Sequence, residues 1–349
     1  MVLDVADRRP IWAAPEWAIE EIREALPESW ELHVVSEPTD GSGDGAGGMG
    51  GASESVRAIR GARAYVGFGV PEEVIEAGAE TLEWVHTGAA GVGSSLHPAM
   101  RESRVRFTNS AGIHGPPMAE TVLGMLLHFT RGLDLALASQ SSASWDDDPF
   151  LDTDTPVREL SSMTVGIVGY GGIGREVGWR LRALGSRVLG LRRGDPTGGE
   201  SPLDTDEHGA VILRGDGGLR RLLAESDAVV LTAPETEGTR GLLSGERIAA
   251  MPNGAVLVNV ARGSLVDEDA LFEALHSGHL RGAALDVFQT EPLPAGHPLW
   301  SLPNVLITPH VSAVTRGFWR RQVDLITGNL ERLLAGQPLL NEVDRARGY

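Results

Sequence analysis

The segment TVGIVGYGGIG, residues 164–174, indicates the fold class of this chain. An apolar, β-rich run ends there in a GxGxxG pattern, and a helical stretch follows directly. In such a pattern Gly169 allows a tight turn, Gly171 lets the backbone approach a pyrophosphate, and Gly174 lets the helix pack against the strand. A lone GxGxxG is a weak motif in a chain with 45 glycines. Its place between a strand and a helix predicts dinucleotide binding in preference to a merely structural turn.

The next β-rich run, RVLGL at 187–191, ends in Arg192 and Arg193. An acidic residue at this point would bind the ribose 2′-hydroxyl of NAD, whereas guanidinium groups pair with a 2′-phosphate. The sequence therefore favours NADP(H). NAD(H) remains possible if the two arginines are solvated and Asp195 binds the ribose instead.

On both sides of this motif, apolar strands alternate with helical patterns, which is typical of a parallel α/β fold. Two stretches interrupt the alternation: a glycine-rich loop at 40–51, expected to be mobile, and a polar, acidic linker at 141–155. The expected strands are 31–36, 62–68, 82–87, 105–109, 164–168, 187–191, 228–233, 255–261, 282–287 and 305–308. The expected helices include 15–26, 53–60, 71–77, a long amphipathic run at 116–140 and a last one at 314–334.

Composition excludes several classes of chemistry. The 349 residues suit two domains, 42% of them are hydrophobic and 22% charged, and none is cysteine. Disulfides, thiolate nucleophiles and cysteine-ligated metals are therefore excluded, and no metal site is expected. All 30 cations are arginine, which removes Schiff-base chemistry and a P-loop lysine.

The net charge of −18 argues against nucleic-acid and membrane-surface partners, since both are anionic. The first residues lack a basic and apolar leader pattern, and no apolar run has the length of a membrane span, so we expect a cytoplasmic protein. The acidic, lysine-free composition fits either a GC-rich genome or adaptation to high salt, and the two interpretations stay open.

Three expected strand ends carry groups suited to one reaction. Arg262 follows the strand at 255–261, Glu291 follows the strand at 282–287, and His310 follows the strand at 305–308. Hydride transfer to a ketone puts negative charge on its oxygen, so a proton donor and a cationic anchor are needed. We expect His310 as the acid, Glu291 as the carboxylate that orients it, and Arg262 as the anchor for a keto-acid carboxylate. Each of these residues by itself would also fit a structural role.

The chain resembles the D-isomer-specific 2-hydroxyacid dehydrogenase family. The motifs that carry the resemblance are VGIVGYGGIG, SDAVVLTAPETEGTRGLL, MPNGAVLVNVARGSLVDEDAL, GAALDVFQTEPLP and NVLITPHVSAVT, between residues 164 and 315. The match is looser before residue 110, where HTGAAGVG at 86–93 and NSAGIHGPPMAE at 109–120 still correspond. The segments PLW at 298–300 and PHVSAVTR at 309–316 look most like the glyoxylate/hydroxypyruvate reductases, which use NADPH.

The resemblance implies roles for individual residues. Arg262, Glu291 and His310 match the family's substrate-binding arginine, tuning glutamate and acid/base histidine. The main-chain N–H groups of the turn formed by Ala89, Ala90 and Gly91 would bind the substrate carboxylate; the structural alternative is an ordinary glycine-rich turn. Asp286 would hold the nicotinamide carboxamide; the structural alternative is a strand-end carboxylate bonded to backbone. The other implied cofactor contacts are Gly172, Ile173, Ala233, Pro234, Thr239 and Ala261.

Two residues depart from the family pattern: Gly93 replaces a frequent aspartate in the substrate turn, and Arg192 replaces the acidic residue after the second strand. The resemblance implies two doubly wound parallel-sheet domains. A Rossmann cofactor domain, 113–312, would be inserted into a flavodoxin-like substrate domain, 1–112 and 313–349. The apolar helix from Met118 to Leu137 predicts a homodimer interface.

The main functional hypothesis is NADPH-dependent reduction of a small 2-keto acid. The alternatives are an NAD-dependent dehydrogenase for another 2-hydroxy acid, phosphoglycerate or formate, and a non-catalytic nucleotide sensor of the same fold. Against a phosphorylated substrate, the turn HTGAAGVGSSL at 86–96 contains no arginine or lysine.

Overall fold

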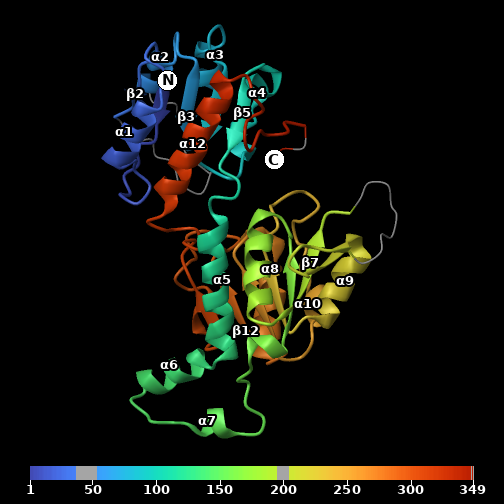
Figure 1. Cartoon of the computed structure of the whole chain (residues 1–349). Coiled ribbons are helices and arrows are strands. Elements are labelled where there is room, and N and C mark those ends of the chain that lie inside the picture. Colours follow the sequence, from blue (N-terminus) through green and yellow to red (C-terminus); the bar gives the residue numbers. More distant parts are fainter. Residues whose placement is uncertain (37–52, 195–203, 347, 349) are drawn as a thin grey trace. The chain divides into compact units, whose positions relative to one another are not determined.

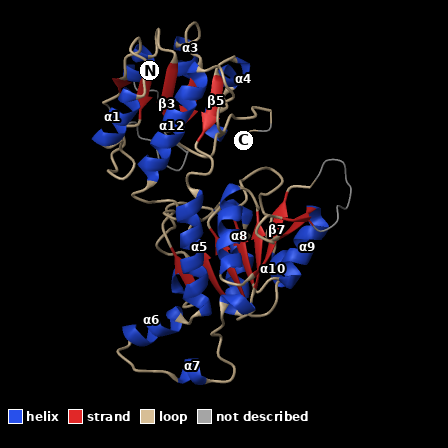
Figure 2. Cartoon of the chain, viewed as in Figure 1, coloured by secondary structure: helices blue, strands red, loops and turns tan. Residues whose placement is uncertain are grey.

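The structure is a computed structural model that describes residues 1–36, 53–194, 204–346 and 348. The chain divides into two compact units, one made of Met1–His114 and Val314–Tyr349 and the other of Gly115–Ala313. The domain boundaries expected from the sequence, after residue 112 and before residue 313, lie one or two residues from this division. In each unit a single layer of strands lies between helices (Figure 2).

The first unit contains a parallel five-stranded sheet in the order β2-β1-β3-β4-β5, which is the flavodoxin-like order. Helices α1 and α12 pack on one face, and α2, α3 and α4 pack on the other. The strands are β1 (Val2–Asp4), β2 (His33–Val34), β3 (Ala64–Gly67), β4 (Trp84–Thr87) and β5 (Arg106–Asn109). The helices are α1 (Glu16–Glu24), α2 (Ser53–Ala58), α3 (Glu72–Ala77), η1 (Gly93–Ser95), α4 (Pro98–Glu102) and α12 (Phe318–Leu334).

The second unit contains an eight-stranded sheet in the order β13-β12-β11-β10-β6-β7-β9-β8, parallel except for β8 at its edge. The expected doubly wound fold class is confirmed in both units. The strands are β6 (Thr164–Val168), β7 (Arg187–Arg192), β8 (Asp204–Thr205), β9 (Val211–Arg214), β10 (Ala228–Leu231), β11 (Ala255–Asn259), β12 (Leu280–Leu285) and β13 (Val305–Ile307). The helices are α5 (Gly115–Thr130), α6 (Leu133–Ser141), α7 (Asp148–Leu151), η2 (Leu160–Ser162), α8 (Gly172–Ala183), α9 (Gly215–Glu225), α10 (Gly245–Ala249), η3 (Gly263–Leu265), α11 (Glu268–His276) and η4 (Pro298–Ser301).

Helices cover both faces of this second sheet, which explains why its central strands are apolar throughout. Figure 1 shows α5 and α8 side by side on one face. The apolar side chains of α9, α10 and α11 pack against the other face. The strand order reverses between β6 and β10, and in folds of this type ligands bind at the carboxyl ends of the strands beside that reversal.

The sequence reasoning missed the strand β1, although it lies inside its sheet between β2 and β3. It is only three residues long, too short for a recognisable pattern, but all three are buried. The strands β8 and β9 were also missed. Such strands are difficult to predict because they are too short to show a hydrophobic pattern, even where their residues are apolar.

The long helix expected at 116–140 is wrong as a single element, because the chain bends by 68° between α5 and α6. Gly132 at the bend has a left-handed backbone (φ 66°), and a Cβ there would lie 2.8 Å from the Phe150 ring. The apolar face of α5 packs on the sheet and is therefore not available as a dimer surface. The exposed apolar side chains follow the bend instead: Leu133, Leu137, Trp145 and Leu151.

The linker expected at 141–155 contains the short helix α7, while the glycine-rich loop at 40–51 lies outside the described residues, as does Asp195. Among the described residues no single helix has the length and apolar character to cross a membrane; the bent pair α5 and α6 together meets that test, by length and composition only.

Candidate active site

The glycine loop joins β6 to α8, and each of its glycines has a different surrounding. Gly169 has φ 98°, and a Cβ on it would lie 2.4 Å from the backbone nitrogen of Ala233. A Cβ on Gly174 would lie 2.6 Å from the carbonyl oxygen of Gly169, so both positions need glycine for packing. Gly171, by contrast, has no atom closer than 4.0 Å to the place of its Cβ.

That open space at Gly171 and Gly172 fits a pyrophosphate. Helix α8 begins at Gly172, so the N–H groups of its first turn, which includes Ile173, have no partner within the helix. Such N–H groups and the helix dipole attract an anion. The loop thus has the shape and polarity of a dinucleotide site.

Tyr170 fixes the outer side of the loop. Its ring is buried in the space that Gly178 and Gly190 leave, since a Cβ at either position would lie within 2.5 Å of the ring or its hydroxyl. Its hydroxyl donates to Asp206 at 2.7 Å. Burial alone would raise the pKa of Asp206, but this bond and backbone N–H donors outweigh burial and lower the pKa.

Arg192, the last residue of β7, is held against this loop. Its Nε donates to the carbonyl oxygen of Tyr170 at 3.0 Å, and its guanidinium lies 5.8 Å from the centre of the Tyr170 ring. Arg193 follows it. A cation therefore lies at the end of the second strand of the nucleotide fold, where NAD-binding proteins commonly have a carboxylate.

The turn after β10 carries three of the other expected cofactor contacts. Ala233 packs against Gly169, as described above. The Thr239 hydroxyl donates to the Pro234 carbonyl at 2.7 Å and accepts from the N–H of Thr236 at 2.7 Å. In the structure this hydroxyl closes the turn, and its contact with a cofactor stays a prediction.

His310 and Glu291 meet directly. The Nδ1 of His310 lies 2.8 Å from Oε2 of Glu291, while Oε1 of the same carboxylate accepts the N–H of Phe288 at 2.9 Å. Both side chains are partly exposed, 28% for His310 and 35% for Glu291. With Nδ1 engaged, the ring nitrogen left for a substrate is Nε2.

Asp286 supports the segment that carries His310. It is fully buried after β12, and its carboxylate accepts from Thr308 Oγ1 at 2.5 Å, Val311 N at 2.9 Å and Ser312 N at 3.0 Å. Its carbonyl oxygen accepts the N–H of His310 at 2.8 Å. These are the contacts of a strand-end carboxylate bonded to backbone. They hold the segment that carries His310, and the carboxamide role of Asp286 stays a prediction.

Arg262 lies just beyond β11, which neighbours β12 in the sheet. Its Nη1 donates to the carbonyl oxygen of Ala261 at 2.7 Å. Asn259, buried at the end of the strand, accepts from Ala261 N and donates to the Arg262 carbonyl, each at 3.0 Å. Sequence reasoning missed Asn259 and Thr308, although an asparagine closing an otherwise apolar strand is a signal that could have found the first.

Three neighbouring strands, β11, β12 and β13, thus present Arg262, Glu291 and His310 at one edge of the sheet. The glycine loop leaves the same edge from β6. His310 and Glu291 are in contact there, and Arg262 follows a neighbouring strand; the roles expected of the three residues stay predictions. Among the described residues no cluster of histidine and carboxylate side chains is arranged to hold a metal ion.

The turn at Ala89–Gly91 belongs to the first unit and follows β4. Gly88 before it donates to the carbonyl of Gly67 at 2.7 Å. Ala89 is buried, Ala90 is half-buried, and Gly91 is exposed, with no atom within 4 Å of the place of its Cβ. The turn is therefore accessible at its tip.

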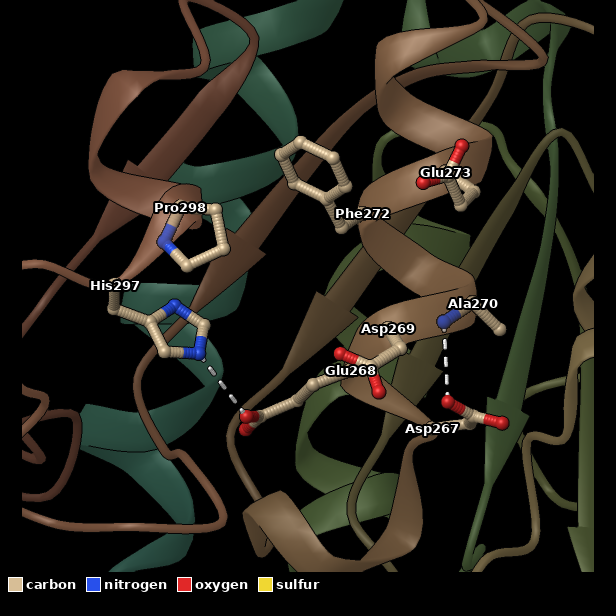
Figure 3. A pocket seen from close by; sticks show the side chains of 8 residues that line it. All are labelled: Asp267, Glu268, Asp269, Ala270, Phe272, Glu273, His297 and Pro298. Atoms are coloured by element: carbon tan, nitrogen blue, oxygen red, sulfur yellow. Dashed lines mark hydrogen bonds and ion pairs between the residues drawn. The ribbon is translucent and has the colours of Figure 1, made fainter.

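A separate hollow of about 410 Å³ lies at the start of α11 (Figure 3). Four carboxylates and His297 line it, and none of the expected site residues does. Asp267 accepts the N–H of Ala270 at 3.1 Å, and Glu268 accepts that of Gln289 at 2.7 Å. These carboxylates serve as a helix cap and a turn support, and their negative charge does not suit an anionic nucleotide.

Comparison with known proteins shows that this chain is similar to dehydrogenases. The sequence model for the NAD binding domain of D-isomer specific 2-hydroxyacid dehydrogenases matches residues 123–312. A glyoxylate/hydroxypyruvate reductase A from Salmonella heidelberg is 34% identical over 277 residues, 77% of this chain and 82% of that protein. A D-3-phosphoglycerate dehydrogenase from Methanocaldococcus jannaschii is 34% identical over 278 residues, 80% of this chain but only 50% of that protein.

A solved structure agrees with these relatives. The D-isomer specific 2-hydroxyacid dehydrogenase from Xanthobacter autotrophicus Py2, in complex with NADPH and MES, matches with a TM-score of 0.78 and 30% identity. The match covers 100% of this chain and 99% of that one.

Proposed function

Since this chain belongs to the D-isomer specific 2-hydroxyacid dehydrogenase family and is an oxidoreductase, we propose that it reduces a small 2-keto acid to the D-2-hydroxy acid with NADPH. The substrate class is that of glyoxylate and hydroxypyruvate. The observation that carries the proposal is the pair of His310 and Glu291 at the sheet edge from which the glycine loop also leaves.

When bound, the dinucleotide supplies a hydride to the carbonyl carbon. His310 holds a proton on Nε2 and gives it to the carbonyl oxygen, so that the carbonyl group becomes an alcohol and the histidine leaves the step neutral. Glu291 keeps the ring oriented through Nδ1 and stabilises the protonated imidazole. In the reverse direction the neutral Nε2 takes the same proton back.

Each unit, considered by itself, offers one group that we propose for binding a carboxylate. Arg262 offers a cationic fork, which also polarises the carbonyl oxygen. The main-chain N–H groups of the Ala89–Gly91 turn offer neutral donors. Residues 86–96, which include this turn, contain no arginine or lysine to bind a phosphate, and this supports a small, unphosphorylated substrate. Sequence identity does not separate the two substrate classes, because the phosphoglycerate dehydrogenase and the glyoxylate reductase are each 34% identical to this chain.

The preference for NADPH rests on Arg192. Its guanidinium is held beside the glycine loop by Tyr170, and a cation there stabilises a 2′-phosphate. The Xanthobacter relative was crystallised with NADPH, which supports the same choice.

We also propose that the protein is a homodimer. The support is the exposed apolar side chains at the bend and beyond, which include Leu137 at 55% and Trp145 at 95% exposure. Light scattering of the wild type and of Leu137→Glu tests this, and a monomeric wild type would refute it. The cytoplasmic location stays a prediction for cell fractionation to test.

The direct test of function is the initial rate of NADPH and NADH oxidation with glyoxylate and hydroxypyruvate, in low and high salt. Fast turnover with NADPH is the expected result. Turnover with NADH alone would refute the cofactor preference but keep the reaction. Tight nucleotide binding without turnover on any 2-keto acid would favour the non-catalytic sensor.

A further inference from the structure

The turn at Ala89–Gly91 is held by its carbonyl groups. The Ala89 carbonyl accepts the N–H of Ser110 at 3.0 Å, and the Ala90 carbonyl accepts Nδ2 of Asn109 at 2.7 Å. Both donors lie at the end of β5. In a trans peptide the C=O and the following N–H point in opposite directions. The N–H groups of Ala90 and Gly91 therefore point away from β5.

These two N–H groups are free to bind a ligand as far as the described residues are concerned. Neither donates a hydrogen bond to any of them. Successive backbone N–H groups that point to one side form a concave site for an anion. The turn therefore has the polarity that the proposed carboxylate needs.

We infer that Asn109 is the positioning residue that keeps the Ala90–Gly91 peptide in this receptor orientation. This inference rests on the proposed function, since it concerns the carboxylate of the same substrate. Asn109 is 5% exposed and uses both ends of its amide. Its Nδ2 holds the Ala90 carbonyl, and its Oδ1 accepts the N–H of Ala111 at 3.2 Å.

The base of the turn is held without Asn109. Ser110 Oγ lies 2.9 Å from both the Thr87 carbonyl and Oε1 of Gln322. Gly88 is enclosed so closely that a Cβ would lie 2.8 Å from Gln322 Nε2 and 3.0 Å from the Phe68 ring. The lower part of the turn is fixed by packing and by buried hydrogen bonds.

The tip is different because Gly91 can adopt backbone conformations of either sign of φ. A flip of the Ala90–Gly91 peptide would point a carbonyl oxygen where a carboxylate should bind, and two negative oxygens would repel. Among the described residues, the only hydrogen bond to the Ala90 carbonyl, and so the only one that opposes this flip, comes from Asn109. A single side chain therefore decides whether the tip attracts or repels the anion.

The test compares Asn109→Ala and Asn109→Asp with the control Asn329→Ala. Asn329 is also buried in the first unit, and both ends of its amide also bond to backbone groups, with Leu340 N at 2.7 Å and Leu340 O at 3.1 Å. It lies seven residues beyond Gln322 on α12, about 10 Å along the helix. Its substitution reproduces the loss of stability without touching the turn.

The substrates are glyoxylate and its neutral amide, glyoxylamide, assayed with NADPH at saturation. We expect Asn109→Ala to lower kcat/KM for glyoxylate about ten- to hundredfold, the range for one hydrogen bond to a charged group, mainly through KM. For glyoxylamide the loss should be less than about threefold. Asn109→Asp should be at least as severe for glyoxylate because it adds a negative charge, and NADPH affinity should be unchanged in every variant.

An equal loss on both substrates, or the same loss in Asn329→Ala, would overturn the inference. Calorimetry of oxalate binding to the NADPH-loaded protein separates it from the proposed reaction. If the wild type reduces no 2-keto acid but its affinity for oxalate falls tenfold in Asn109→Ala, the proposed reduction is refuted and the carboxylate-binding role of the turn is supported. A wild type that neither binds oxalate nor reduces a 2-keto acid would refute both.

Discussion

Glu291 holds His310 through Nδ1 at 2.8 Å, and this contact decides which ring nitrogen can do chemistry. The same carboxylate is itself fixed by the N–H of Phe288 at 2.9 Å. The backbone carbonyl of Asp286 accepts the N–H of His310, and its carboxylate accepts the N–H of the next residue, Val311. The acid is therefore held by Glu291 at its ring and by Asp286 at its backbone.

Replacing His310 with asparagine should lower kcat for 2-keto-acid reduction by about 100-fold or more, the usual scale of general acid catalysis. Affinity for NADPH, measured by fluorescence titration, should stay within about twofold. His297→Asn is the matched control, because His297 also lies near a glutamate of the same unit, 3.6 Å from Glu268. If turnover survives in His310→Asn, His310 is not the acid.

Replacing Glu291 with glutamine should reduce the rate of reduction about ten- to hundredfold, because the protonated imidazole loses a charged partner. Oxidation of the hydroxy acid forms the same protonated imidazole, so it should be slowed as well. The measurement is kcat in both directions at one pH. A kcat that stays within about twofold of the wild type in both directions would show that Glu291 does not act through His310.

Replacing Arg192 with glutamine should raise KM for NADPH about ten- to hundredfold, since one charged hydrogen-bond donor to the 2′-phosphate is lost. KM for NADH should change little. Arg187→Gln is the control at the other end of β7, where the arginine binds Glu225 at 2.8 Å. A parallel change for both nucleotides would show that Arg192 supports the loop and does not select the phosphate.

Replacing Gly263 with alanine should disrupt the sheet edge that carries Arg262. A Cβ at Gly263 would lie 1.9 Å from the backbone carbon of Phe288, which cannot move aside like a flexible side chain. We expect a loss of about 3 kcal/mol or more of unfolding free energy, by analogy with other buried backbone strain. Gly124→Ala in α5, with nothing within 4 Å, should instead stabilise by about 1 kcal/mol. Urea unfolding measures both.

Acid should destabilise the first unit through two buried histidines. Burial lowers the pKa of His86 to about 3 and that of His114 to about 4, from an ordinary value of 6.5. The unfolded chain therefore binds protons that the folded chain refuses. Stability is full above pH 6.5 and falls below it, by about 1.4 kcal/mol per pH unit for each histidine down to pH 4.

The pH dependence of unfolding, followed by tryptophan fluorescence, tests this. His86→Gln should reduce the slope between pH 6.5 and 4 by about half, whatever its effect on stability at pH 7. His33→Gln, at an exposed position of the same unit, should leave the slope unchanged. A His86→Gln slope equal to that of the wild type would contradict the account.

Elements that are formed by residues close together in the sequence could be predicted from the sequence. The strand, glycine loop and helix at 164–174 are one contiguous unit, and the boundaries of β6 agree with the expected 164–168. Glu291 and His310 could be assigned because each follows a recognisable strand, and parallel strands bring their ends to one edge. The bend at Gly132 could not be assigned, because it depends on the space that the distant Phe150 ring occupies.

How the predicted site residues are held depends on tertiary packing. The sequence predicts that Asp286 holds the nicotinamide carboxamide, and that role stays a prediction. The structure shows that its carboxylate accepts hydrogen bonds from residues more than twenty positions away, at 308–312. Asn109 was not singled out at all, because its role depends on the carbonyl of Ala90, nineteen residues earlier. A residue's chemistry can be recognised from its type and its position after a strand, whereas its partners are set by the packing of strands that are remote in sequence.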